Sequence, residues 1–110
     1  MEIAYDDFSK VDMRIGTILK AEPFPEAKVP SYKLEIDLGP VGVKHSSAHI
    51  TNYSIEELVG KKVVCVVNFK PKQVANFMSE VLVLGVLSKS GVVLLIPDRP
   101  GSVDAGEKIA

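Results

Sequence analysis

Two short apolar runs rich in β-branched residues set the strongest limit on how this chain can fold. One is V-V-C-V-V, beginning at Val63, and the other is V-L-V-L, beginning at Val81. Both are too short for long helices, and β-branched side chains favour extended backbone. We therefore interpret both runs as buried strands.

Two further segments alternate apolar and polar residues with the period of two that is typical of half-buried strands. In Asp12–Glu22 the odd-numbered residues from Met13 to Ala21 are expected on one face and the even-numbered ones on the other. In Tyr32–Leu38 the even-numbered residues are expected to point inward. Gly16 predicts a bulge or a sharp coil, which lets one long strand serve both halves of a small barrel.

The remaining elements complete an all-β pattern with two short helices. Further strands are predicted at Val43–Ile50, Lys62–Asn68, Glu80–Leu87 and, after the hairpin signal S-K-S-G, at Val92–Ile96. Helices are predicted at Tyr5–Lys10 and after the N-cap Ser54, whose partner in a capping box is Glu57. One helix between the third and fourth strands is the order of the OB-fold. We expect an all-β, five-stranded OB-fold barrel.

Composition indicates one soluble globular domain covering residues 1–110. Hydrophobic residues make up 46% of the chain and charged residues 25%, which excludes disorder. No apolar stretch approaches the length that spans a bilayer, and the acidic N-terminus is unlike a signal peptide, so we expect a cytoplasmic protein without membrane insertion. Cys65 is the only cysteine, so no internal disulfide can form, and its apolar neighbours favour burial over reactivity.

Charge is unevenly distributed along the chain. The net charge of −1 argues against a general nucleic-acid coat protein. Residues 1–12 hold four carboxylates and one lysine, whereas residues 61–80 hold four lysines and one glutamate. A nearly neutral total can therefore hide one basic face, and the oppositely charged segments can also pair within the molecule or between subunits.

The segment K-H-S-S-A-H, beginning at Lys44, is the most enzyme-like cluster in the sequence. On a strand, His45 and His49 lie about 13 Å apart, too far for one zinc ion. A Ser/His catalytic pair would lack an orienting acid and a strained nucleophile turn. Two interpretations remain: Ser46 and Ser47 line a barrel wall beside surface histidines, or the segment contacts a ligand. No phosphate loop, paired zinc motif or dinucleotide fingerprint is present, and no cofactor is expected.

The segment Asn68–Gly85, which includes the loop between the two apolar runs, gathers lysines, amides and aromatic rings. Lys70, Lys72 and Asn76 with Phe69 and Phe77 supply the phosphate cations, hydrogen bonds and stacking surfaces that bind single-stranded or looped RNA. The same phenylalanines suit an apolar groove for extended peptide. In the alternative, structural interpretation, the rings cap the barrel and the lysines keep the loop soluble.

Motifs along the whole chain resemble the tRNA-binding domains that are appended to methionyl-tRNA synthetases or occur as free-standing dimers. The motifs are D-M-R-I-G-T-I, F-P-E-A-K-V-P-S-Y-K-L-E-I-D-L-G, E-E-L-V-G-K-K-V-V-C-V-V-N-F-K-P-K, S-E-V-L-V-L-G and V-V-L-L-I-P. This resemblance implies an OB-fold homodimer without enzymatic activity that binds tRNA-like RNA and unfolded or precursor polypeptides. K-H-S-S-A-H-I and S-E-V-L stand where synthetase-type members have R-Q-I-V-S-G-I and S-x-G-M, a departure that resembles the secretion-related chaperone branch.

The resemblance also implies which residues form a binding groove. By position, the residues carried over are Ser46, Ser47, Asn68, Lys70, Lys72 and Ser79. We expect Phe69, Phe77 and Met78 to hold apolar polypeptide segments there, since a thioether adapts to varied side chains. Glu80 is expected to add a negative charge beside the groove, which disfavours phosphate. Val81–Leu87 is apolar on both faces, so one face must meet a helix, the C-terminal tail or a second subunit.

Overall fold

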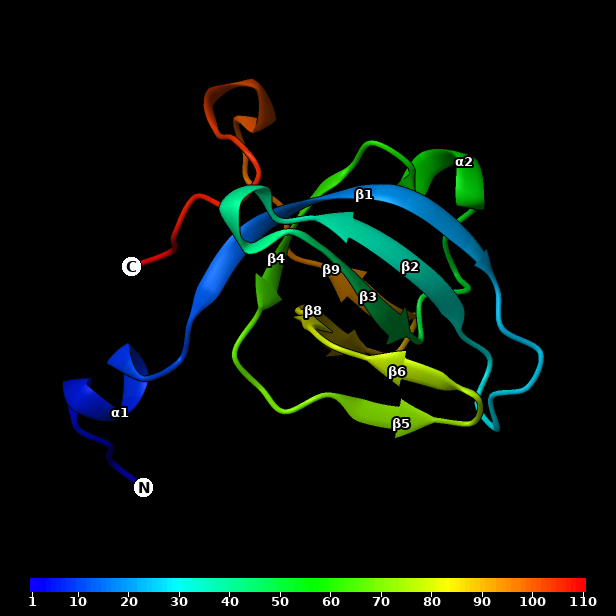
Figure 1. Ribbon diagram of the computed structural model, residues 1–110, viewed down its shortest axis with the longest axis horizontal. Helices are drawn as coiled ribbons and strands as arrows, with labels where there is room; N and C mark the ends of the chain where they lie inside the picture. Colours follow the sequence, from blue (N-terminus) through cyan, green and yellow to red (C-terminus); the bar gives the residue numbers. More distant parts are fainter.

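A five-stranded antiparallel sheet in the order β3-β2-β1-β4-β7 curls into a nearly closed barrel in the computed structural model, which describes residues 1–110 (Figure 1). The strands are β1 Met13–Pro23, β2 Tyr32–Asp37, β3 Val43–Ala48, β4 Lys62–Val66, β5 Lys72–Val74, β6 Phe77–Ser79, β7 Leu82–Val83, β8 Gly85–Ser88 and β9 Gly91–Leu94. The helices are α1 Tyr5–Ser9 and α2 Ile55–Leu58, with 3-10 turns at Gly39–Val41 and Pro100–Ser102. The predicted all-β barrel with two short helices is confirmed.

Helix α2 begins at the predicted capping box. The Ser54 hydroxyl accepts a hydrogen bond from the backbone N–H of Glu57, and the Glu57 carboxylate accepts one from the backbone N–H of Ser54 at 2.7 Å. These two bonds satisfy N–H groups that the first helical turn leaves free. Gly60 then takes a positive φ of 89°, which suits the predicted end of the helix.

Strand β1 serves both halves of the barrel, as predicted, but its irregularity lies elsewhere than expected. Its first half pairs with β4 and its second half with β2, and the register shifts between Ile18 and Lys20. The bulge is therefore at Leu19: Ile18 before it and Ala21 after it are buried, whereas Leu19 is exposed. The expectation that the odd-numbered residues from Met13 to Ala21 share one face is therefore wrong. The prediction of a bulge or coil at Gly16 is wrong, and Gly16 instead allows close packing against its neighbours. A Cβ there would lie 2.5 Å from Ile36 Cγ2.

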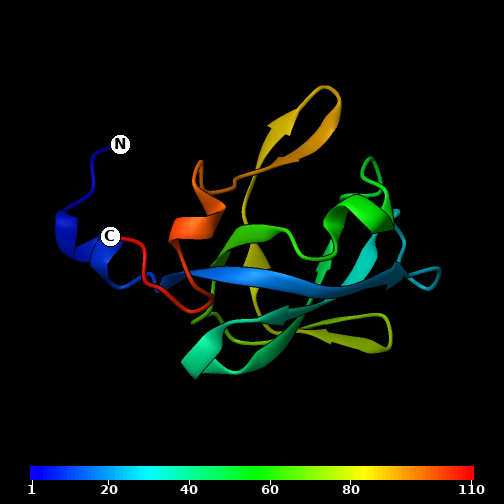
Figure 2. The same ribbon diagram turned by 90° about the horizontal axis from the view of Figure 1, so that it is seen from above.

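Two predictions for the segment after β4 are wrong. What was expected to be a short loop forms a β5–β6 hairpin, turned at Ala75, which has a positive φ of 52°. The expected single strand Glu80–Leu87 has two partners, because β7 pairs with β4 and β8 pairs with β9. The β8–β9 hairpin consequently extends away from the barrel, as Figure 2 shows from above.

The core fills the barrel interior with aliphatic side chains. Ile36, Leu38, Leu58 and Val63 are fully enclosed, and they come from β2, the turn after it, α2 and β4. Cys65 is buried in the same core, as predicted, and burial raises the pKa of its thiol to about 12. A thiol of this kind acts as a small apolar group at neutral pH.

The two ends of the chain meet at one end of the barrel. The tail pairs with the start of β1, where Gly106 N–H donates to Ile15 O at 2.7 Å. The Lys62 ammonium donates to the carbonyls of Pro100 and Val103, so this lysine secures the tail and adds nothing to a basic face. No helix is long and apolar enough to cross a membrane.

Candidate binding groove

Between β3 and the segment joining β6 to β7, the barrel is closed by a few specific bonds. Glu80 N–H donates to His45 O at 2.8 Å, and His45 N–H donates to Glu80 Oε1 at 2.9 Å. The His45 ring nitrogen Nδ1 lies 3.1 Å from the same carboxylate oxygen. The sequence placed Glu80 as a negative charge beside the groove, whereas the structure uses this carboxylate to hold two strands together.

The environment of Glu80 favours its charged form. Partial burial opposes the negative charge, but the hydrogen bonds from His45 and the nearby positive charge of Lys44 outweigh that cost. The result is a Glu80 pKa below its ordinary value. The carboxylate is therefore ionised throughout the neutral range, where it can accept both bonds from His45.

The three serines of the candidate site occupy neighbouring positions with different roles. Ser46 is almost fully buried, and its hydroxyl donates to Val81 O at 2.7 Å, which joins β3 to the chain before β7. Ser47 N–H donates to the hydroxyl of Ser79 at 3.2 Å. Ser46 is thus a structural residue, whereas Ser47 and Ser79 line an open groove.

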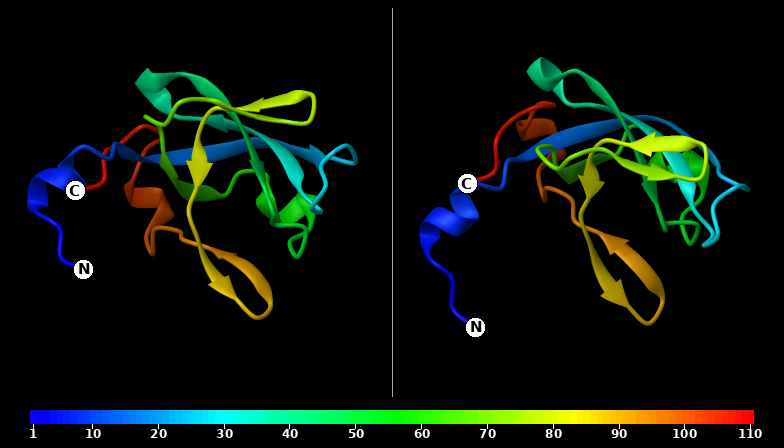
Figure 3. Two further views of the ribbon diagram at one scale, coloured as in Figure 1. Left: turned by 90° about the horizontal axis from the view of Figure 1, so that it is seen from below. Right: turned by 60° about the horizontal axis from the view of Figure 1, so that its bottom comes forward.

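That groove has a volume of about 590 Å³, within the range of about 300–1,000 Å³ usual for ligand sites. It lies beside the chain that runs from β6 through β7 into β8, between the two hairpins visible in Figure 3. Asn52 donates to Val92 O at 3.1 Å, which ties the β8–β9 hairpin to the chain after β3. Its lining comprises Ser47, Ala48, His49, Ile50, Lys72, Gln73, Val74, Ser79, Leu82, Val83, Leu84, Gly85, Leu87 and Val92.

A second hollow of about 260 Å³ continues this groove toward the loop between β1 and β2. The two share His49 and Val74, and the second adds Glu26, Lys28 and Val29. The two hollows are therefore neighbours on the surface. Lys72 is the only Lys, Arg, Asp or Glu in the lining of the larger hollow, whereas the smaller one has Glu26 and Lys28.

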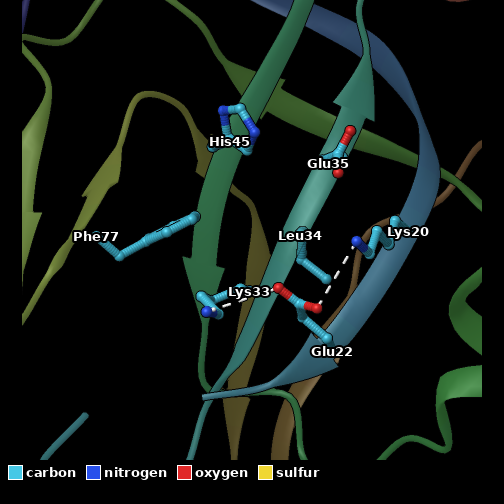
Figure 4. A pocket seen from close by; sticks show the side chains of 7 residues that line it. All are labelled: Lys20, Glu22, Lys33, Leu34, Glu35, His45 and Phe77. Carbon is cyan, nitrogen blue, oxygen red and sulfur yellow. Dashed lines mark ion pairs between the residues drawn. The ribbon is translucent and has the colours of Figure 1, made fainter. Parts of the chain in front are cut away.

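The outer face of β1, β2 and β3 is charge-balanced. Glu22 lies 3.8 Å from the Lys20 ammonium and 3.6 Å from that of Lys33, as Figure 4 shows. Glu35 lies between Lys20 and His45 in the strand register. This alternation of signs leaves no continuous row of cations for a phosphate backbone.

Phe77 belongs to this outer face and not to the groove. Its ring meets those of Phe24 and His45 edge-on, with centroids 5.5 and 5.9 Å apart, and the Lys33 ammonium lies 5.9 Å from its centroid. A pocket of about 130 Å³ opens beside it (Figure 4). Phe77 is therefore partly buried against neighbouring rings, whereas Phe69 is exposed.

Of the ten residues predicted for the site, the structure gathers Ser47, Lys72 and Ser79 in the groove. Asn68 lies elsewhere, where its side chain accepts from Asp12 N–H at 3.0 Å and donates to Lys10 O at 2.7 Å. The others outside the groove are Ser46, Phe69, Lys70, Asn76, Phe77 and Met78.

Sequence reasoning missed most of the apolar lining. Leu82, Leu84, Leu87 and Val92 were assigned to buried strands, because an apolar run gives no sign of which side chains remain open. The one available signal was that Val81–Leu87 is apolar on both faces.

The comparisons with known proteins agree with this fold. The family model described as a putative tRNA binding domain matches residues 13–108. The CsaA chaperone of Picrophilus torridus is 54% identical, with a TM-score of 0.94 over 99% of this chain and 100% of that one. CsaA of Bacillus anthracis is 50% identical, with a TM-score of 0.92 over all of both chains.

The curated relatives are longer proteins. The methionine–tRNA ligase of Leptospira biflexa is 41% identical over 101 residues, which cover 91% of this chain and 15% of the ligase. The methionine–tRNA ligase of Thermotoga maritima is 37% identical over 108 residues, which cover 98% of this chain and 17% of that protein. The chain thus spans less than a fifth of these relatives.

Proposed function

The chain belongs to the family of putative tRNA-binding domains, and we propose that it is a non-enzymatic, dimeric binding protein for unfolded or export-precursor polypeptides. It acts in the cytoplasm and keeps a capacity for tRNA as a second ligand. The observation that carries this proposal is the lining of the groove, which is mostly apolar and holds a single lysine. Likeness to two CsaA chaperones over the full chain supports the same role.

The balance of charge favours polypeptide over RNA as the main ligand. A nucleic acid carries one negative charge per nucleotide, and its affinity comes largely from cations that neutralise these charges. The groove offers Lys72, with Lys70 exposed nearby in sequence, whereas the outer sheet face pairs its lysines with glutamates. An apolar segment of an unfolded chain needs no such neutralisation and gains from burial against the groove leucines.

The dimer is proposed to form through the β8–β9 hairpin. Val86 and Val93 are cross-strand partners that face away from the groove, since Leu87 and Val92 form the neighbouring pair that lines it. Val86 is 51% exposed and Val93 42% exposed, and neither is covered by a helix or by the tail. A second copy is the partner that fits this face, because two valine pairs would bury each other.

The polypeptide role is tested by suppression of aggregation. Reduced insulin serves as the aggregating client, and light scattering follows its aggregation with and without the protein. We expect the wild type to delay aggregation and Leu82→Gln to do so less, because Leu82 is 46% exposed in the groove. Leu19→Gln is the matched control, since Leu19 is 47% exposed on β1 outside the groove. Equal activity of the two variants contradicts the assignment of the groove.

The tRNA role is tested by how the affinity for tRNA depends on salt concentration. Each phosphate contact contributes about −0.7 on single strands and about −0.9 on duplex to the slope of log affinity against log salt. The double substitution Lys70→Ala, Lys72→Ala should make this slope less steep by the contribution of about two phosphate contacts. The affinity for labelled tRNA is measured at several salt concentrations. An unchanged slope removes both lysines from the RNA contact set.

A further inference from the structure

The groove is bordered by a strand edge whose backbone groups have no partner. Leu84 N–H donates to Val64 O, and Leu84 O accepts from Leu95 N–H, so this residue directs both groups toward the strands β4 and β9. In an antiparallel pair, successive residues turn their backbone groups to opposite sides. The N–H and C=O groups of Val83 and Gly85 therefore point away from β4 and β9.

The same alternation extends the open edge to Leu87. Val86 pairs with Val93 and Ser88 with Gly91 in the β8–β9 hairpin, whose register places the hydrogen-bonded pairs at even-numbered residues of β8. Leu87 consequently turns its N–H and C=O to the side shared by Val83 and Gly85. Six backbone groups on alternate residues from Val83 to Leu87 form one edge, and no side chain hydrogen-bonds to it.

This edge belongs to the groove and is open at its Leu87 end, whereas Val83 at the other end is buried. Val83, Gly85 and Leu87 all line the groove, whose opposite walls are formed by residues 47–50 and 72–74. Leu87 is 89% exposed, which leaves its backbone accessible. Strand edges of this kind accept a further strand unless they are shielded by charge, proline or a covering element. No charged residue or proline occurs in Val83–Leu87.

We propose that an extended polypeptide segment adds as a strand to the edge Val83–Leu87, and that it lies in the groove with an acidic residue near Lys72. This inference rests on the polypeptide binding proposed above and specifies its geometry. Only a polypeptide presents N–H and C=O groups at a spacing that matches all six groups of the edge. The charge also fits, because one lysine in an apolar lining complements an apolar segment with a single carboxylate.

Backbone methylation of a peptide probe tests strand addition directly. The probe is a fluorescein-labelled heptapeptide that alternates leucine and serine and ends in aspartate, and its binding is measured by fluorescence anisotropy. Two derivatives carry N-methyl groups on the odd or on the even residues. We expect one derivative to lose affinity by about tenfold or more and the other to bind like the parent, because only one set of N–H groups faces the edge.

A matched pair of protein variants tests the same edge by changing the protein and not the peptide. Leu87→Pro removes the Leu87 N–H at a position where an edge strand tolerates proline, and Leu87→Ala removes the side chain but keeps the N–H. We expect the proline variant to bind the parent peptide about tenfold more weakly than the alanine variant. Hydrogen exchange of wild type with saturating peptide should slow at the amides of Val83, Gly85 and Leu87, which keeps the test decisive if the proline variant fails to fold.

Each of the remaining outcomes contradicts one part of the proposal. If the wild type binds no peptide, the proposals of polypeptide binding and of strand addition are both wrong. If both methylated peptides bind like the parent, polypeptide binding stands but strand addition is wrong. If the peptide converts a dimer into monomers, a second copy occupies the edge. If tRNA, and not peptide, slows exchange of these amides, RNA is the ligand of the groove.

Discussion

Glu80 and His45 hold the barrel closed through a reciprocal pair of hydrogen bonds. Glu80 N–H donates to His45 O at 2.8 Å, while the Glu80 carboxylate accepts from His45 N–H at 2.9 Å. One residue thus contributes its backbone and its side chain to the same strand partner. The carboxylate is a structural acceptor, and its charge is part of the closure between β3 and β7.

The lowered pKa of Glu80 predicts a dependence of stability on pH. A carboxyl group whose pKa is lower in the folded state stabilises the fold above its unfolded pKa, and that contribution is lost as the pH falls through the folded pKa. Glu80→Gln should therefore be less stable than wild type at pH 7, and the difference should shrink in acid. Urea denaturation across pH 3 to 7 measures it, with Glu2→Gln at the exposed N-terminus as the control. A difference that is constant with pH would contradict the role of the charge.

Replacing Gly16 by a larger residue is predicted to destabilise the core. An alanine Cβ would lie 2.5 Å from Ile36 Cγ2, 3.0 Å from Leu38 Cδ2 and 3.3 Å from Cys65 Sγ. Gly16→Ala should lower the free energy of unfolding by about 1–3 kcal/mol, the usual cost of overpacking a core. Thermal and urea denaturation measure this loss. Gly101→Ala is the matched control, since nothing lies within 4 Å of its added Cβ.

The outward face of the β8–β9 hairpin is predicted to hold the dimer together. Val86→Glu combined with Val93→Lys replaces an apolar cross-strand pair by an oppositely charged one, which preserves the hairpin while removing its apolar surface. Light scattering at micromolar concentration should give a dimer mass for wild type and a monomer mass for this variant. Lys89→Glu at the hairpin tip changes charge alone and should remain dimeric. A monomeric wild type would refute the dimer itself.

Asn68 is predicted to stabilise the N-terminal segment and to contribute nothing directly to ligand binding. Asn68→Ala removes the bonds to Asp12 N–H and Lys10 O, and should lower the free energy of unfolding by about 1–2 kcal/mol. Hydrogen exchange should increase at Asp12 while peptide affinity stays unchanged. Asn76→Ala, on the turn of the β5–β6 hairpin, is the control, because its side chain forms no hydrogen bond. Weaker peptide binding by Asn68→Ala would show that Asn68 does contribute to the binding site.

The sequence by itself determined the strands β1 to β4, the capping box of α2 and the burial of Cys65. These depend on local patterns, such as the alternation of Tyr32–Leu38 or the Ser54 and Glu57 pair, that the tertiary fold preserves. The composition of the segment after β4 identified it as a candidate site, and the family resemblance supplied Ser47, Lys72 and Ser79. Neither could separate these three residues from Asn68 or Phe77.

Only the tertiary structure decided the bulge at Leu19, the close packing of Gly16 and the open edge Val83–Leu87. A bulge depends on how two strands pair, and the space beside Gly16 depends on side chains far away in the sequence, Ile36 and Cys65 among them. An apolar run has the same sequence signature whether its second edge meets another strand or remains free. Val81–Leu87 was therefore correctly identified as a strand region, while its unpaired backbone became visible only once β4 and β9 had taken the other side.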